Sequence, residues 1–268
     1  MPQELYLLDT FSSQLFQGNP SPVCLLEREI PEENLRQLAM ELSMPVMAFV
    51  YPPEANQSYP IRYFTRTGEI PACGHATLGA AEVLAQVKGQ RDIIFQTKEG
   101  VQITARREGK RNFISYPKYF PQDYPFPHAL LEQLGKPKLL NHFYSSALET
   151  LFLEFAEAKA VREIQPDYQK IMALVPEIKE LVIMAKSPEV DKDVILRSFC
   201  PWIGIDEDPV TGSIHSVLGP YWEEKLLKKS LRVYQASERG GDLWVQSFAD
   251  RVEIGGECVL YMKGILEM

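Results

Sequence analysis

Cysteine is scarce in this sequence, and its spacing is irregular. The four cysteines, Cys24, Cys73, Cys200 and Cys258, lie far apart, and none belongs to a CxxC pair. This spacing argues against a zinc site and against a disulfide framework, so no metal is expected. Thiols that form no disulfides are typical of a reducing compartment, and we therefore expect a cytoplasmic protein.

Long hydrophobic runs, an excess of basic residues and several common motifs are also missing. The sequence has no apolar stretch of about 18 residues and no signal peptide at its start, so we expect no membrane partner. A net charge of -8 at pH 7 argues against nucleic acid as a partner, because phosphates are neutralised by clustered Lys and Arg. The absence of GxGxxG, P-loop and GxSxG motifs argues against a nucleotide site and a serine hydrolase.

The sequence does contain the material for a globular core. Of the 268 residues, 45% are hydrophobic and 24% are charged, and this length suits one large domain or two of ordinary size. The proline-rich segment 117–128 is typical of a linker between two lobes. Helices are expected at 31–42, 74–86, 128–135, 166–175 and from 212 to about 226. Strands are expected at 4–9, 21–27, 46–51, 59–65, 92–97, 101–106, 111–116, 150–154, 180–185, 194–200, 231–236, 242–248, 251–254 and 257–262.

Two of these helices begin in a similar way. Each follows a proline-containing loop and starts at small residues, Cys73-Gly74-His75 in one case and Thr211-Gly212-Ser213 in the other. The helix at 74–86 is apolar all round, which predicts a buried helix. A helix N-terminus offers unpaired amides and a positive dipole end, and glycine lets a ligand approach closely. Both starts could therefore hold a carboxylate or a developing enolate, or they could be ordinary helix caps.

Titratable residues accompany these helix starts. Asp208 and His75 could exchange protons with a bound carbon acid. Cys73 could have a lowered pKa and act as a nucleophile or proton carrier, or it could be a small buried residue. His215 could line a cleft or bond locally in the first helical turn. His142 is expected in a polar turn at the surface.

Motifs along nearly the whole chain resemble those of the phenazine-biosynthesis-protein family. The resemblance rests on Asp9-Thr10-Phe11 with Gly18-Asn19-Pro20 and Val23, on the stretch from Phe64 to Thr77, on Glu207 to Ser213, on Gln235 to Gly241 and on Val252 to Gly256. The resemblance implies the α+β fold of diaminopimelate epimerase, in which two similar lobes each wrap a curved sheet around a central helix. It implies a first lobe of residues 1–117 plus 255–268 and a second lobe of residues 118–254.

The resemblance also implies an activity. The best-known activity of the family isomerises a dihydro-hydroxyanthranilate by moving a proton, without a metal or organic cofactor, and homodimers are common in the family. This chain is therefore expected to isomerise a small carboxylated substrate. The substrate is expected between the lobes. By position, Asp208 and His75 would be catalytic, and Cys73 is a candidate substitute proton carrier because the wider fold includes cysteine-based racemases. The substrate-binding residues would be Gly18, Asn19, Gly74, Thr211, Gly212 and Ser213.

One position departs from the family pattern. Counting back from Phe49-Val50 places Val46 where the family carries its proton-transferring glutamate, and counting forward from Leu42-Ser43 places Met44 there. Neither side chain can transfer a proton. The chain is therefore expected to be either an isomerase that uses another group or a binding homologue that has lost catalysis. A hydrolase using Cys73 or Ser213 is less favoured, and Glu41, Glu69 and Glu207 remain open as alternative carboxylates.

Overall fold

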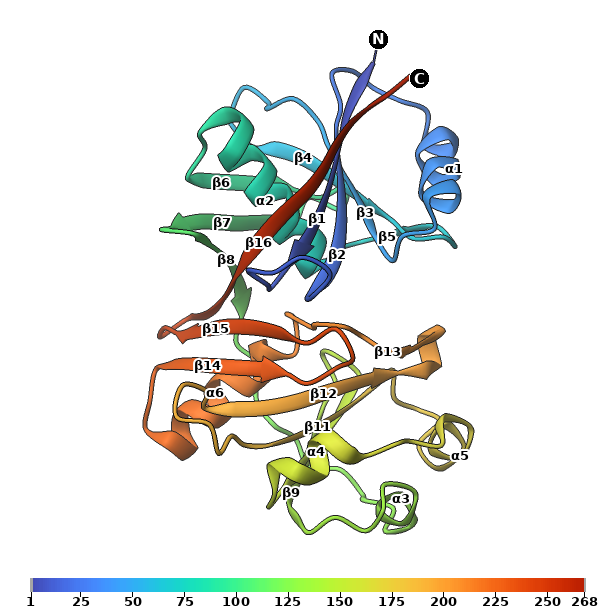
Figure 1. Ribbon diagram of the computed structural model, residues 1–268, viewed down its shortest axis with the longest axis vertical. Helices are drawn as coiled ribbons and strands as arrows, with labels where there is room; N and C mark the ends of the chain where they lie inside the picture. Colours follow the sequence, from blue (N-terminus) through green and yellow to red (C-terminus); the bar gives the residue numbers. More distant parts are fainter. Residues whose placement is uncertain (1, 268) are drawn as a thin grey trace. The chain divides into compact units, whose positions relative to one another are not determined.

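Eight strands close on themselves around one helix in the first part of the chain. The computed structural model describes residues 2–267 and divides the chain into two units, of which the first comprises residues up to Ser115 and those from Ile254 onward. Its strands follow one another in the order β1 (Gln3–Thr10), β2 (Asn19–Leu25), β3 (Met47–Val50), β4 (Tyr59–Phe64), β6 (Asp92–Gln96), β7 (Gln102–Glu108), β8 (Arg111–Pro117) and β16 (Arg251–Leu266). The last strand, β16, pairs antiparallel with β1 and so closes the sheet (Figure 1).

Helix α2 (Gly74–Lys88) is the central helix of this unit. Nine consecutive residues, Ala76–Leu84, are buried, because strands surround the helix and contact it from β1, β2, β3 and β7. The approach to β2 is close, since a Cβ atom on Gly79 would lie 2.2 Å from Ser21 Oγ. Helix α1 (Glu32–Leu42) packs by Leu35 and Ala39 on the outer side of the sheet.

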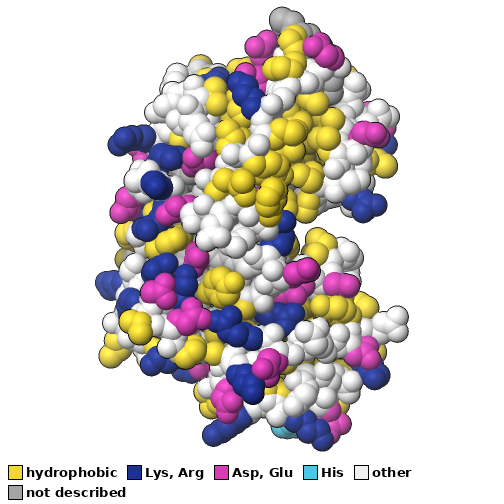
Figure 2. Space-filling view, in the orientation of Figure 1, with side chains coloured by type: hydrophobic (Ala, Val, Ile, Leu, Met, Phe, Trp, Pro, Cys, Tyr) yellow, Lys and Arg dark blue, Asp and Glu magenta, His cyan; other side chains and the backbone are white. Residues whose placement is uncertain are grey.

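Several large apolar side chains remain exposed on this unit. Phe16 is 71% exposed, Met262 45% and Ile265 55%, and the Phe16 ring lies 6.4 Å from the ring of Tyr261. We call these four residues the apolar face. Figure 2 shows hydrophobic side chains gathered over the visible side of this unit. A patch of this kind is typical of an interaction surface.

The second unit, Tyr116–Glu253, is built on a sheet with helices on both faces. Its strands run in the order β15 (Gly241–Ser247), β14 (Ser230–Gln235), β12 (Val194–Cys200), β11 (Glu180–Lys186), β10 (Thr150–Phe155) and β9 (Leu139–Ser145), and β13 (Ile205–Glu207) pairs with β12. Strands β10 and β12 are buried along their whole length, as expected for a sheet covered on both sides. One face packs on α3 (Ala129–Gln133), α4 (Ala158–Glu163) and α5 (Tyr168–Leu174).

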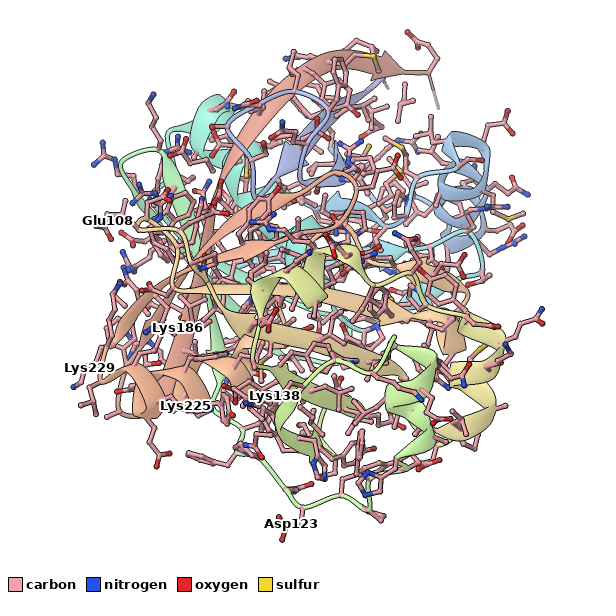
Figure 3. All side chains as sticks on the ribbon, turned by 60° about the horizontal axis from the view of Figure 1, so that its bottom comes forward. Glu108, Asp123, Lys138, Lys186, Lys225 and Lys229 are labelled. Atoms are coloured by element: carbon pink, nitrogen blue, oxygen red, sulfur yellow. The ribbon has the colours of Figure 1, made fainter. Side chains whose placement is uncertain are left out.

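Helix α6 (His215–Leu226) contacts β14 and β15. Polar contacts at its C-terminal half fix its position, because Tyr221 and Lys225 both donate to the buried carboxylate of Glu154 on β10. Lys225 is labelled in Figure 3, where it extends from the end of α6. Near the middle of the helix, a Cβ atom on Gly219 would lie 3.0 Å from Val252, so this residue lets α6 lie close to its neighbours.

The predicted fold class is confirmed, with curved sheets and a central helix, while several local predictions are wrong. The strands expected at 251–254 and 257–262 are one continuous strand, β16, because Gly255 and Gly256 lie against Phe113 and Phe11 and do not break the pairing. His142 lies in β9 rather than in a turn, and α4 and η1 (Pro201–Ile203) were not expected. Helix α6 starts at His215 instead of Gly212. Within residues 2–267, no helix combines the length and the apolar character that a membrane span needs.

Candidate functional site

The start of α2 carries the first group of predicted residues, the N-cap Cys73 and the first two helical residues Gly74 and His75, which we call the α2 half-site. Cys73 precedes the helix in an extended conformation, and its side chain makes no capping bond. Its carbonyl accepts a hydrogen bond of 2.7 Å from Thr77 Oγ1, which in turn lies 2.6 Å from Tyr63 Oη. The amides of Gly74 and His75 belong to the first turn, where helix geometry supplies no acceptor. They can therefore donate to an anion.

His75 is neutral in this setting. Burial lowers the pKa of His75 to about 4, although part of the residue is still exposed. Its Nδ1 atom lies 3.4 Å from Cys73 Sγ, and its carbonyl accepts from Ser21 Oγ at 3.3 Å. A neutral imidazole can accept a proton or donate a hydrogen bond, so His75 suits a role beside an acid or a thiol.

An arginine on the preceding strand fixes this loop. Arg62 donates from Nε and Nη2 to the two carboxylate oxygens of Glu69, both at 2.7 Å, and its guanidinium lies 5.0 Å from the ring centroid of Phe64. Lys98 also bonds Glu69, at 3.2 Å. The two cations and the hydrogen bonds keep the pKa of Glu69 below its usual value. Glu69 is thus committed to β5 (Glu69–Ile70) and the loop rather than to proton transfer.

The loop before α6 carries the second group, Asp208, Thr211, Gly212 and Ser213, which we call the α6 half-site. The Asp208 amide donates to Ser198 O at 3.0 Å, and its Oδ2 atom accepts from Thr211 Oγ1 at 2.6 Å. A turn then leads into the helix, since the His215 amide donates to Gly212 O at 3.1 Å and the Ser216 amide to Ser213 O at 3.0 Å. The turn displaces the helix start from Gly212 to His215.

Gln235, at the end of β14, holds the same loop at two points. Its Nε2 atom donates to Asp208 O at 2.7 Å, and its Oε1 atom accepts from the Thr211 amide at 2.8 Å. Gln235 is fully buried, so these bonds are shielded from water. No role for Gln235 was predicted, although it begins one of the sequence stretches that carry the family resemblance.

The two half-sites share a local plan. Arg197 on β12 donates to both oxygens of Glu207, at 2.7 and 2.8 Å, and its guanidinium lies 4.9 Å from the ring centroid of Phe199. The sequence separation between Glu207 and Ser213 equals the separation between Glu69 and His75. Each unit therefore uses an Arg–Glu pair, with a Phe two residues after the Arg, to hold the loop that leads into its central helix. Glu207, like Glu69, is engaged in an ion pair.

His215 occupies the first turn of α6 and is 1% exposed. Its Nε2 atom has no hydrogen-bond partner among residues 2–267, and burial lowers the pKa of His215 to about 3. The local hydrogen bond that was one of the two predictions for His215 is therefore not formed by Nε2. The lowered pKa keeps the imidazole neutral.

The remaining predicted residues lie on the first unit. Gly18 has a φ of 73°, and a Cβ atom there would lie 2.0 Å from Thr10 O, so only glycine fits. Asn19 begins β2, and its carbonyl accepts from Thr10 Oγ1 at 3.0 Å. Val46 is 7% exposed and precedes β3, whereas Met44 is half-buried and Glu41 is exposed. Neither of the two positions that could correspond to the family glutamate, Val46 and Met44, carries a carboxylate.

No group of three or more His, Cys, Asp or Glu side chains that could hold a metal ion occurs in the part of the chain that the structure describes. Disulfides are likewise absent there, as the cysteine spacing predicted. The chemistry available in the half-sites is that of one aspartate, one neutral histidine, one cysteine, hydroxyls and amides.

Comparison with known proteins places the chain in one family over nearly its whole length. A family model described as "Phenazine biosynthesis-like protein" matches residues 8–264. An uncharacterized isomerase of Halalkalibacterium halodurans is 33% identical, with 99% of each chain covered. The crystal structure of a PhzF-family phenazine biosynthesis protein of Enterococcus faecalis is 31% identical and covers 100% of both chains with a TM-score of 0.92. A hydroxyproline epimerase of Agrobacterium vitis shares the fold alone, at 10% identity and a TM-score of 0.60 over 99% of this chain and 92% of that chain.

Proposed function

The chain belongs to the family of phenazine biosynthesis-like proteins, and on that premise we propose that it is an isomerase that moves a proton within a small carboxylated substrate. The reaction would be an isomerisation or an epimerisation and would use no metal or organic cofactor. The name of the Halalkalibacterium relative supports the reaction class, and the epimerase fold supports proton transfer at carbon.

The observation that carries this proposal is the repeated plan of the half-sites. In each unit an Arg–Glu pair fixes a loop, and the loop delivers a titratable side chain to the start of a buried helix. Amides at such a start stabilise negative charge without rearrangement, which is what the deprotonation of a carbon acid needs. Ordinary capping would not require a titratable side chain in both loops.

Asp208 is the proposed base, because Thr211 and Gln235 hold its loop in place and its carboxylate is accessible in part. His75 and Cys73 are the proposed partners that return the proton to the substrate. The 3.4 Å approach of Cys73 Sγ to His75 Nδ1 places the thiol and the neutral imidazole within hydrogen-bonding reach of each other. Gly18, Asn19, Gly74, Gly212 and Ser213 are the proposed contacts to the substrate, the last three through their amides.

A second function, ligand binding without turnover, is favoured by Val46. The family glutamate is absent at this position, and the buried Val46 side chain leaves no carboxylate there. Such a protein would keep both half-sites and bind the same carboxylates. The two functions differ in whether solvent hydrogen enters the bound ligand.

Deuterium exchange at a carbon acid separates the two functions. Three compounds are tested. The first is a dihydro-hydroxyanthranilate, which the family resemblance suggests. The other two, 4-hydroxyproline and methylitaconate, appear in the names of two proteins that share this fold. The isomerase proposal expects solvent deuterium in one of these compounds, and loss of incorporation in Asp208→Asn and in Cys73→Ala. Thermal stabilisation by a compound that gains no deuterium would instead identify a binding protein. Incorporation that survives both substitutions would show that the residue roles are wrong.

We also propose that the protein acts in the cytoplasm as a homodimer. The apolar face of the first unit supports this proposal, since Phe16, Tyr261, Met262 and Ile265 expose apolar area that a second copy could cover.

A further inference from the structure

Glu180, the first residue of β11, is a carboxyl group that neither the sequence nor the family comparison assigns to the site. Ser198 Oγ on β12 donates to its Oε1 atom, and Thr150 Oγ1 on β10 lies 3.1 Å from its Oε2 atom. Thr150 and Ser198 are both fully buried. The carboxyl group is therefore held between two hydroxyls of neighbouring strands.

The hydrogen-bond geometry around Thr150 distinguishes the two protonation states of Glu180. A threonine hydroxyl has one proton to donate. Thr150 Oγ1 lies 3.0 Å from Leu148 O, which can only accept, and 3.1 Å from Glu180 Oε2. If Thr150 donates its proton to Leu148 O, it has none left for Glu180. The contact between Thr150 Oγ1 and Glu180 Oε2 is then a hydrogen bond only when Glu180 is protonated and donates to Thr150. A protonated Glu180 satisfies both contacts, whereas an ionised Glu180 loses one of them.

Ser198 connects this carboxyl group to the proposed base. Its hydroxyl donates to Glu180, and its carbonyl accepts the Asp208 amide at 3.0 Å. Burial, followed by the negative charge of Asp208, raises the pKa of Glu180 to about 7, against the opposing hydrogen bond from Ser198. Two carboxyl groups that interact and differ in their surroundings are expected to ionise at separate pH values.

The other charged groups of this region do not supply a compensating cation. Cys200 on β12 is buried, and the charges of Glu180 and Asp208 add to burial in raising its thiol pKa, so it stays neutral. Glu207 is paired with Arg197, and the neighbouring Lys179 is paired with Glu149. A proton on Glu180 is thus the available means of avoiding a second negative charge beside Asp208.

We propose that Glu180 is a positioning residue of the α6 half-site: it holds its proton in mildly acidic solution and releases it only near neutrality, so that below neutrality Asp208 carries the negative charge of the Glu180–Asp208 pair. This inference rests on the proposed function, in which Asp208 is the base and the substrate is an anion. Loss of the Glu180 proton places a second negative charge next to Asp208. The half-site then repels a carboxylate and disfavours negative charge on the substrate, so that alkaline pH weakens both substrate binding and turnover.

NMR spectroscopy of the full chain with carboxyl-labelled Glu and Asp tests the proposal without a substrate. The Glu180 signal is assigned by its disappearance in Glu180→Gln, and the chemical shift is followed against pH. We expect a midpoint near pH 7 in the unmodified chain. In Asp208→Asn the midpoint should fall, because the like charge is gone, although burial still holds it above the ordinary range of glutamate. A midpoint in the ordinary range of glutamate, or no change in Asp208→Asn, would overturn the proposal.

The Asp208 signal gives a second readout that a merely structural role would leave unchanged. In the unmodified chain it should show a second inflection at the Glu180 midpoint, and this inflection should vanish in Glu180→Gln but persist in the exposed control Glu224→Gln. Persistence in Glu180→Gln would contradict the coupling of the two groups. Because these titrations need no turnover, a failed exchange assay would count against the proposed function while leaving the state of Glu180 measurable.

Discussion

Arg197 donates two hydrogen bonds to the carboxylate of Glu207, and 8% of the Arg197 side chain is exposed. The pair joins a long strand, β12, to the short strand β13, and the next residue along the chain is Asp208. A buried bidentate pair fixes direction as well as distance. The proposed base is therefore held by a neighbour that takes no part in proton transfer.

Glu207→Gln should weaken this anchor, because Arg197 then keeps a buried charge without its carboxylate. We expect a loss of about 2 kcal/mol in the free energy of unfolding and slower deuterium exchange into substrate, measured by urea unfolding and by NMR. The exposed substitution Glu224→Gln serves as the control and should change neither quantity. Equal stability of the two variants would mean that the pair does not hold the loop.

Gly79→Ala tests the close approach of α2 to β2. The added Cβ atom would lie 2.2 Å from Ser21 Oγ and 3.0 Å from Ser21 Cβ. Overpacking of this kind costs about 1–3 kcal/mol, of which alanine returns about 1 kcal/mol through its helix propensity. Urea unfolding should show the net loss, and Ser21→Gly in the same chain should recover most of it. Gly264→Ala, which meets no atom within 4 Å, is the matched control and should be neutral.

Acid should destabilise the protein through its buried histidines. Burial lowers the pKa of His75 to about 4 and that of His215 to about 3, from an ordinary value of 6.5. Below pH 6.5 the unfolded chain binds protons that the folded chain does not, so stability is lost as the pH falls towards the folded-state pKa values. Each histidine contributes about 1.4 kcal/mol per pH unit in that window.

His215→Gln should therefore make the unfolding free energy less dependent on pH between 4 and 6.5, by about 1.4 kcal/mol per unit. Urea titrations at several pH values measure this slope. The exposed His128→Gln is the control and should leave it unchanged. The same slope in His215→Gln as in the unmodified chain would show that His215 is protonated in the folded state.

Glu180 should make the protein less stable as the pH rises, opposite to the effect of the two histidines. Its pKa is raised from 4.5 to about 7, so the folded chain holds a proton that the unfolded chain has lost between these values. This contribution to stability is present below pH 4.5 and is lost as the pH rises through about 7. Glu180→Gln, which mimics the protonated acid, should gain stability relative to the unmodified chain over that range. A constant difference at all pH values would contradict the raised pKa.

The apolar face makes a prediction about assembly. The double variant Phe16→Ser with Tyr261→Ser removes two exposed rings that lie 6.4 Å apart. If this face joins two copies, light scattering should show a homodimer for the unmodified chain and a monomer for the variant at equal concentration. Leu227→Ser, at an exposed apolar residue on the second unit, is the control and should remain dimeric. A dimer that survives the double variant would place the interface elsewhere.

Much of the fold follows from local sequence patterns. Alternating and continuous apolar runs predicted most strands, because a buried sheet imposes a period of two or full burial on its residues. The all-round apolar segment at 74–86 predicted the central helix of the first unit, which spans Gly74–Lys88. Helix α4 and strand β9 were missed, because Ala158–Glu163 is too short to show a helical period and the apolar residues of Leu139–Ser145 come in adjacent pairs rather than in alternation.

The half-sites divide in the same way between sequence and tertiary structure. The sequence by itself located the start of α2 at Gly74 and marked the loop around Gly212 that leads into α6, whereas the turn that moves the start of α6 to His215 was decided by the tertiary structure. Only the tertiary structure decided the partners of those residues. Gln235 reaches Asp208 across 27 residues and Ser198 reaches Glu180 across 18, and no pattern in a linear sequence states which buried polar groups will meet. Their meeting depends on strand pairing, and so do the pKa values of the groups that they touch.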